Sequence, residues 1–141
     1  MAAYVKYELG IEKMLEAGNM GSDTWQLILS NTAPNVATNT TAASATELSR
    51  AGGYTAGGVN CTVTSAASTG GVYKLILAAP ASPTWTASGV GFTFRYVILY
   101  DLTVTQCIGY WDYGSALVMN GTNGDTFTPT LDAVGGTFTV T

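Results

Sequence analysis

Histidine is absent from the 141 residues of this chain, and charged residues make up only 10% of it. Without histidine, the usual general base for a serine or cysteine nucleophile is missing. A typical soluble domain carries roughly 25% charged residues, so this chain has unusually few. Its polar character comes mostly from Thr, Ser, Asn and Gly instead. Such short side chains are covered by a partner at little entropic or desolvation cost. The composition therefore favours a non-enzymatic protein. Two interpretations of its surface are equally compatible with it: permanent contact with other protein, or a free monomer whose solubility depends on hydroxyl and amide groups.

Basic runs and long apolar runs are also missing. The net charge is −4, and lysine and arginine occur singly, so the electrostatic footprint of a nucleic-acid-binding protein is lacking. No apolar run approaches the ~20 residues of a membrane span, and the negative charge disfavours anionic membrane surfaces. The N-terminus is amphipathic and acidic rather than signal-like, which predicts synthesis in a cytoplasm without an export signal.

Cysteine occurs only at Cys61 and Cys107, which are far apart and form no Cys-x-x-Cys pair. With no histidine, a zinc site would need carboxylate ligands without any recognisable motif. Two unpaired, buried thiols are the default interpretation in a reducing compartment. A disulfide between them stays open if the fold brings them together in an oxidising setting.

Carboxylate pairs are the only acid–base machinery left to consider, as in glycoside hydrolysis. Asp101, Asp112, Asp125 and Asp132 sit at predicted turns or strand ends, where an Asp side chain bonds to nearby backbone. That role accounts for all four. We therefore predict no catalytic, cofactor-binding or metal-binding residue and no cofactor.

One helix is predicted, over residues 4–17, with Tyr4, Ile11, Met14 and Leu15 on its apolar side. Its glutamates mark the solvated side, and Gly18 with Asn19 would cap its end. A polar, low-complexity stretch follows at 31–49, which reads as a long surface loop: either flexible or an arm laid over a neighbour. The glycine-rich residues 51–58 precede a strand pattern and not a helix, so a phosphate-binding loop is disfavoured.

Strand patterns recur at roughly ten-residue spacing between Gly, Asn and Asp turns. Residues 92–100, FTFRYVILY, form the strongest apolar run and predict a central strand. The fold class is therefore mainly β: one domain over residues 1–141, an antiparallel β-sandwich or jelly-roll-like barrel with one N-terminal helix. The predicted strands cover residues 24–29, 59–64, 72–77, 84–86, 92–100, 105–111, 116–119, 125–131 and 137–141.

Aromatic residues cluster in the second half of the chain. Aromatic rings on a sheet can stack against sugars, but on alternating strands they mostly point inward. A core or subunit interface is therefore favoured over a carbohydrate-binding face for Tyr96, Tyr100, Tyr110, Trp111 and Tyr113.

Several segments occur together in an order that resembles a family of small structural proteins from tailed bacteriophages. They are the predicted opening helix (4–17), TWQLILSNTAP (24–34), GGYTAGG (52–58), FRYVILYD (94–101), IGYWDYG (108–114) and NGDTFTPTLDAVGGTFTVT (123–141). The resemblance spans nearly the whole chain and implies a non-enzymatic virion protein, most simply a capsid decoration or cement protein. A tail, neck or host-recognition protein of the virion is the alternative.

The resemblance also implies partners and a location. The expected partner is the major capsid protein, with self-association as a homotrimer at the capsid surface after assembly in the host cytoplasm. Decoration proteins work by burying area across capsomer boundaries. The candidate contact elements are the N-terminal residues, the 31–49 loop and the glycine-rich loop. If the 31–49 loop is such an element, deletion of residues 35–44 should weaken capsid binding and leave the fold intact.

Overall fold

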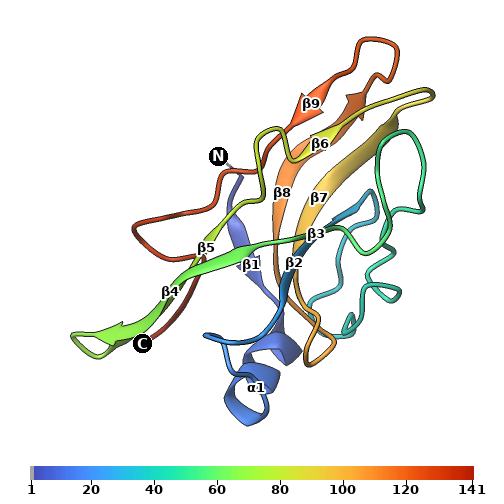
Figure 1. The fold of residues 1–141 in the computed structure, drawn as a ribbon. Helices are drawn as coiled ribbons and strands as arrows, with labels where there is room; N and C mark the ends of the chain where they lie inside the picture. Colours follow the sequence, from blue (N-terminus) through green and yellow to red (C-terminus); the bar gives the residue numbers. More distant parts are fainter. Residues whose placement is uncertain (1) are drawn as a thin grey trace.

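A five-stranded antiparallel sheet forms the centre of the computed structural model, which describes residues 2–141 (Figure 1). The strand order is β1-β8-β7-β2-β3, so β7 is the middle strand, as its apolar sequence predicts. The strand bounds are β1 Tyr4–Lys6, β2 Trp25–Ser30, β3 Val59–Asn60, β7 Phe92–Asp101 and β8 Gln106–Met119.

Two smaller sheets accompany the central one. The first has the order β10-β5-β4, and the second pairs β6 with β9. All strand pairings are antiparallel, so the predicted mainly β class with one helix near the N-terminus is confirmed. The strand bounds are β4 Thr62–Thr69, β5 Val72–Ala78, β6 Trp85–Thr86, β9 Thr126–Phe127 and β10 Phe138–Val140.

The central sheet is buried on both faces. Side chains alternate along a strand, so Trp25, Leu27 and Leu29 of β2 lie on one face. They share a core with Leu75, Leu77 and Phe138 of the second sheet, which gives a sandwich-like arrangement of two layers. Ile28 lies on the opposite face in a separate core. Strand β2 is therefore almost fully buried, and not half-buried as the sequence predicted.

Residues 31–49 cover that second face (teal in Figure 1). The segment contains turns and no helix or strand, as predicted, but Ala45 is only 2% exposed and packs with Ile28 and Tyr100. The amide of Leu48 donates to the Leu29 carbonyl at 2.8 Å. The Ser30 hydroxyl donates to the carbonyls of Ala45 and Thr46. This segment, hereafter the cover segment, packs against the fold through Ala45 and Leu48. The effect of deleting residues 35–44 stays a prediction.

The helix is shorter than predicted: α1 spans Glu8–Glu16, and residues 4–6 form strand β1 instead. Tyr4 pairs with Trp111 of β8, a partner more than a hundred residues away that no local pattern reveals. Tyr7, in extended conformation, separates the two elements. The predicted solvated glutamates are exposed, but Leu15 is 69% exposed and does not belong to the buried side. The helix approaches β8 closely because Gly10 has no side chain there.

Strand β8 is one continuous strand where the sequence predicted two. Gly114 lies in its middle with φ of +82°, a conformation that glycine adopts without strain. Gly114, which suggests a break in the sequence pattern, therefore lies within β8 and does not end the strand.

Candidate interaction surface

The four predicted turn aspartates bind backbone amides. Asp125 accepts the amide of Asn120 at 2.8 Å. Asp132 accepts the amides of Gly135 and Val134, which lower the pKa of its carboxyl. Asp112 accepts the amide of Gly114 but lies inside β8, so its predicted place at a turn or strand end is wrong.

Arg95 and Asp112 form a bidentate ion pair across β7 and β8. The Arg95 Nε and Nη2 atoms lie 2.7 and 2.8 Å from the two carboxylate oxygens of Asp112. The arginine lowers the pKa of that carboxyl, and the pair is about one-third exposed. It is the one salt bridge among residues 2–141.

Asp101 is the exception among the aspartates, because it is completely buried. One carboxylate oxygen accepts the amides of Thr103 and Val104, whereas the other, Oδ2, has no hydrogen-bond partner. Burial, together with the negative charge of Asp23, raises the pKa of Asp101 to about 7. The sequence gives no indication that Asp23 and Asp101 lie close together, because only the register of β2 and β7 brings them near each other.

The glycine-rich residues 51–58 are occupied by the protein itself. The Glu47 carboxylate accepts both the amide of Gly57 and the hydroxyl of Tyr54 at 2.6 Å. Gly52 packs against the backbone of Gly91, and Gly58 against the carbonyl of Leu27. The amide of Gly57 already donates to the Glu47 carboxylate, so it is not free to bind a phosphate. The loop therefore serves as a turn and packing element.

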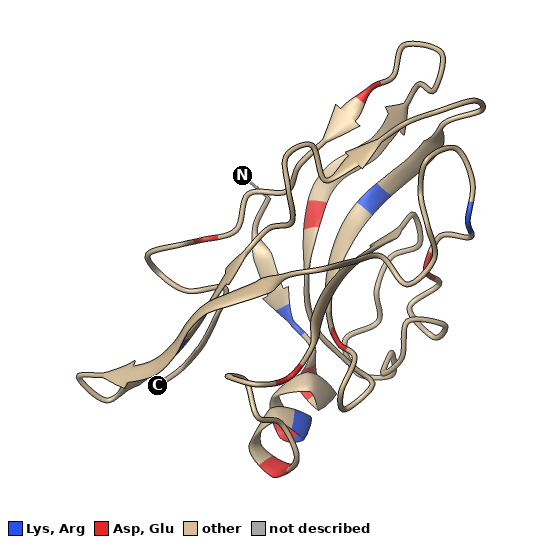
Figure 2. Cartoon of the chain, in the orientation of Figure 1, with Lys and Arg blue, Asp and Glu red and all other residues tan. Residues whose placement is uncertain are grey.

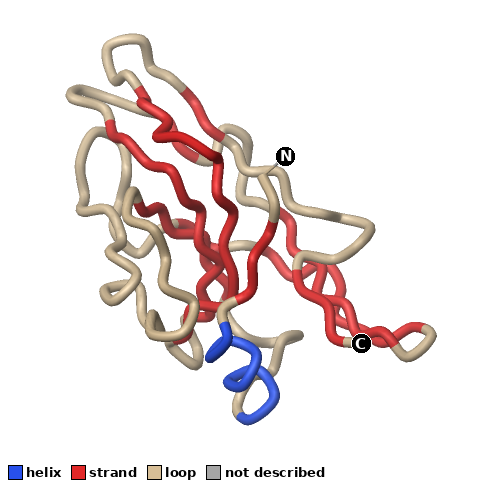
Figure 3. Tube along the Cα trace, turned by 180° about the vertical axis from the view of Figure 1, so that it is seen from behind, coloured by secondary structure: helices blue, strands red, loops and turns tan. Residues whose placement is uncertain are grey.

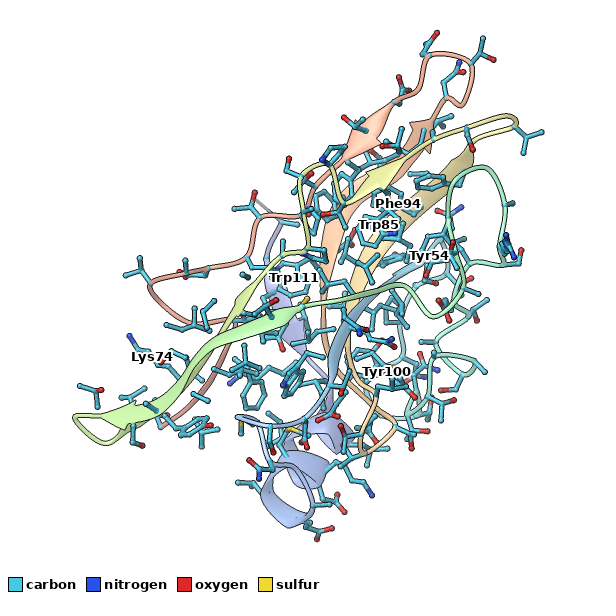
Figure 4. All side chains as sticks on the ribbon, in the orientation of Figure 1. Tyr54, Lys74, Trp85, Phe94, Tyr100 and Trp111 are labelled. Carbon is cyan, nitrogen blue, oxygen red and sulfur yellow. The ribbon has the colours of Figure 1, made fainter. Side chains whose placement is uncertain are left out.

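Most of the clustered aromatic rings pack inward. Tyr96, Tyr100 and Trp111 are each 6% exposed, which confirms the core interpretation for them. Figure 4 shows Tyr100 away from Trp85 and Phe94, in keeping with two separate cores. Tyr110 and Tyr113 are half-buried, and each packs edge-on against other rings. Because these rings pack against other parts of the protein, they form no broad exposed aromatic surface.

Both cysteines are free thiols. Cys107 is fully buried in the core beneath the cover segment, and Cys61 is half-buried between β3 and β4. Burial raises the pKa of each thiol to about 12, so both are poor nucleophiles near neutral pH. Cys107 is buried as predicted, whereas Cys61 is less so.

Several hollows lie on the surface of residues 2–141. One, of about 340 Å³, lies beneath the N-terminus and is lined by Tyr4, Trp111, Asp132 and small residues. Its one carboxylate is already bound to backbone amides. Nowhere in residues 2–141 do three His, Cys, Asp or Glu side chains gather as a metal site would require. Nor does any helix in this range have the length and apolar character to cross a membrane.

Charged side chains are few and are spread over several elements of the molecule (Figure 2). Eight of the fourteen charged residues fall within residues 1–50, and Lys74 is alone between Arg50 and Arg95. Three valines, Val90, Val118 and Val134, are at least 72% exposed but lie on separate loops or strands. The surface formed by residues 51–94 is thus polar and nearly uncharged.

The β4–β5 hairpin is the most prominent feature of that uncharged region. Figures 1 and 3 show it extending away from the five-stranded sheet, with its tip at residues 70–71. Six of the eight residues of β4 are exposed, and β4 is the outer strand of its sheet. Of the predicted contact elements, residues 4–6 pair with β8 and the 31–49 segment packs against the central sheet, and their role in contacts stays a prediction.

No protein-family model, curated protein or solved structure matches the chain.

Proposed function

We propose that the protein is a non-enzymatic structural component of a tailed-phage virion, a capsid decoration protein that binds the outside of the head. The observation that carries this proposal is the polar surface of residues 51–94 with its projecting hairpin, on which Lys74 is the one charged residue. A surface of Thr, Ser, Ala and Gly loses little hydration energy or side-chain entropy when a flat protein shell covers it. The family resemblance of the sequence points the same way.

The expected partner is the major capsid protein, and the location is the capsid surface after assembly in the host cytoplasm. Self-association belongs to the proposal, with a homotrimer as the form that the resemblance implies. Binding to the assembled shell stabilises it by mass action, because the protein adds contacts that only the intact shell offers.

Mass spectrometry and cryo-electron microscopy of the virions encoded with this gene test the proposal. Hundreds of copies on the head would support a decoration role. A few copies in the tail or neck would favour the alternative structural role, which includes host recognition. Absence of the protein from purified virions would overturn both.

A second measurement separates stabilisation from mere presence. Heads that lack the protein should release DNA at a lower temperature than complete heads, and added purified protein should restore the higher temperature. Equal release temperatures for the two kinds of head would contradict a reinforcing role.

A further inference from the structure

Strand β4 presents a long unpaired edge. It pairs with β5 on one side, and no other strand of residues 2–141 pairs with it on the opposite side. Backbone N–H and C=O groups along that side therefore face outward, which makes the edge a template for another strand. A register shift between Val63 and Ser65 interrupts the first part of the strand, and Ser65–Thr69 continues in regular pairing.

The usual protection of such an edge is largely missing. Natural edge strands carry lysines, prolines or inward charges that prevent pairing with other chains. Residues 62–69 read TVTSAAST and contain neither a charge nor a proline. The charge nearest along the hairpin, Lys74 of β5, donates to the Val134 carbonyl at 3.3 Å and is thereby held beside the loop before β10.

The strand that best complements this edge is another copy of itself. The other outer strands in the described part of the chain are β1, β3, β6, β9 and β10, and each has only two or three residues. When two identical strands pair antiparallel about a two-fold axis, the residue on the axis faces its own copy. A residue a given number of positions before it faces the residue the same number of positions after it in the other strand. A charge at the axial position would then face the same charge in the other copy, at a cost in stability. The charge-free sequence removes that cost.

We infer that β4 pairs antiparallel with β4 of a second copy, about a two-fold axis at Ala67. Ser65 of one copy then faces Thr69 of the other, and the two three-stranded sheets become one continuous sheet. The contact joins copies in twos, so within a trimeric assembly it would link one trimer to the next. It does not depend on the virion role and can be tested on the purified protein alone.

The test places charges at the two facing positions, both of which are exposed and so tolerate substitution in the folded chain. The double variant S65K/T69K brings lysine opposite lysine at two places across the axis. The matched variant S65K/T69E changes the same positions but brings lysine opposite glutamate. Sedimentation velocity at micromolar to millimolar concentration gives the mass of each, and circular dichroism with urea unfolding checks that both are folded.

The expected wild-type mass is that of an even number of chains. S65K/T69K should have half that mass, and S65K/T69E should keep the wild-type mass. V118K, at an exposed position on β8, serves as a control for added positive charge and should also keep it. A wild-type monomer or an odd-numbered assembly would overturn the inference, as would an unchanged mass for S65K/T69K or equal loss in both double variants. A monomer would instead favour an extended segment of a different protein as the occupant.

Discussion

At the scale of single residues, two positions place unusual demands on the fold. Asp101 keeps an unpartnered carboxylate oxygen in the protein interior, next to Asp23. Gly109 lies beneath the ring of Tyr4, where an added methyl group would overlap the tyrosine. Each of these residues leads to a measurable prediction about stability.

The first prediction concerns pH. With its pKa raised to about 7, the Asp101 carboxyl is protonated in the folded protein over a range in which the unfolded chain has already lost that proton. The free energy of unfolding should therefore fall as pH rises from about 4 to about 7, by linkage. Asp101→Asn, which keeps an oxygen for Thr103 and Val104, should remove this fall and stabilise the protein by about 1–3 kcal/mol at pH 8.

Urea unfolding at pH 5 and pH 8 measures the effect. Asp132→Asn is the matched control, because Asp132 is exposed and its lowered pKa keeps it ionised across this range. The control should retain the wild-type difference between the two pH values. A wild-type protein that is equally stable at both would contradict the raised pKa of Asp101.

The second prediction concerns Gly109. Gly109→Ala should displace the Tyr4 ring and loosen β1, lowering the free energy of unfolding by roughly 1–3 kcal/mol through overpacking. Gly21→Ala is the control, since its nearest neighbour would be the Ala66 methyl at an ordinary 3.4 Å. Thermal unfolding of both variants provides the comparison. Equal midpoints for the two would show that Tyr4 moves aside without cost.

At the scale of elements, the cover segment differs most from its expected role. Its polar, low-complexity sequence suggests a free loop, yet it closes one face of the central sheet with Ala45 and with hydrogen bonds from Leu48 and Ser30. The segment contributes backbone carbonyls and the apolar side chains of Val36, Ala42 and Ala45, whose spacing forms no hydrophobic period in the sequence. An irregular segment can therefore be essential to a core.

The third prediction separates the two roles of that segment. Ala45→Asp should bury a charge with no designed partner beneath the segment and destabilise the protein by about 3 kcal/mol or more. Ala43→Asp, two residues earlier at an exposed position, should change stability by less than about 0.5 kcal/mol. Chemical denaturation distinguishes them. Similar stabilities for the two variants would mean that the segment is a loose loop after all.

The sequence predicted elements well where the pattern is local. The apolar run of β7 and the alternation of β5 gave the strands and the central position of β7. It failed for residues 4–6, because their strand conformation depends on pairing with Trp111, Tyr110 and Gly109, far along the chain. The edge of β4 was equally hidden: its sequence indicates a strand, but only the sheet order shows that one side is unpaired.

At the scale of the whole molecule, electrostatics contributes little to holding the domain together. One exposed ion pair, Arg95 with Asp112, is present among residues 2–141, and the rest of the stabilisation lies in two apolar cores and the sheet hydrogen bonds. Exposed ion pairs are worth little, and salt screens them further.

The fourth prediction follows from that balance. Raising NaCl from 50 to 500 mM should change the free energy of unfolding by less than about 0.5 kcal/mol. Guanidinium is itself a salt, so urea titrations at the two ionic strengths are the appropriate measurement. A large loss of stability at high salt would point to long-range charge interactions that the scattered side chains do not suggest.

The position of β1 at the edge of β8 has a consequence for how the chain acquires its structure. Tyr4 pairs with Trp111, and Trp25 pairs with Asp101. During synthesis, the central sheet therefore cannot form until most of the chain has left the ribosome. At synthesis rates of about 5–20 residues per second, the early strands stay unpaired for several seconds. Folds dominated by such distant pairings also fold slowly once released. The low charge of the chain thus leaves the nascent protein with little electrostatic protection against premature association.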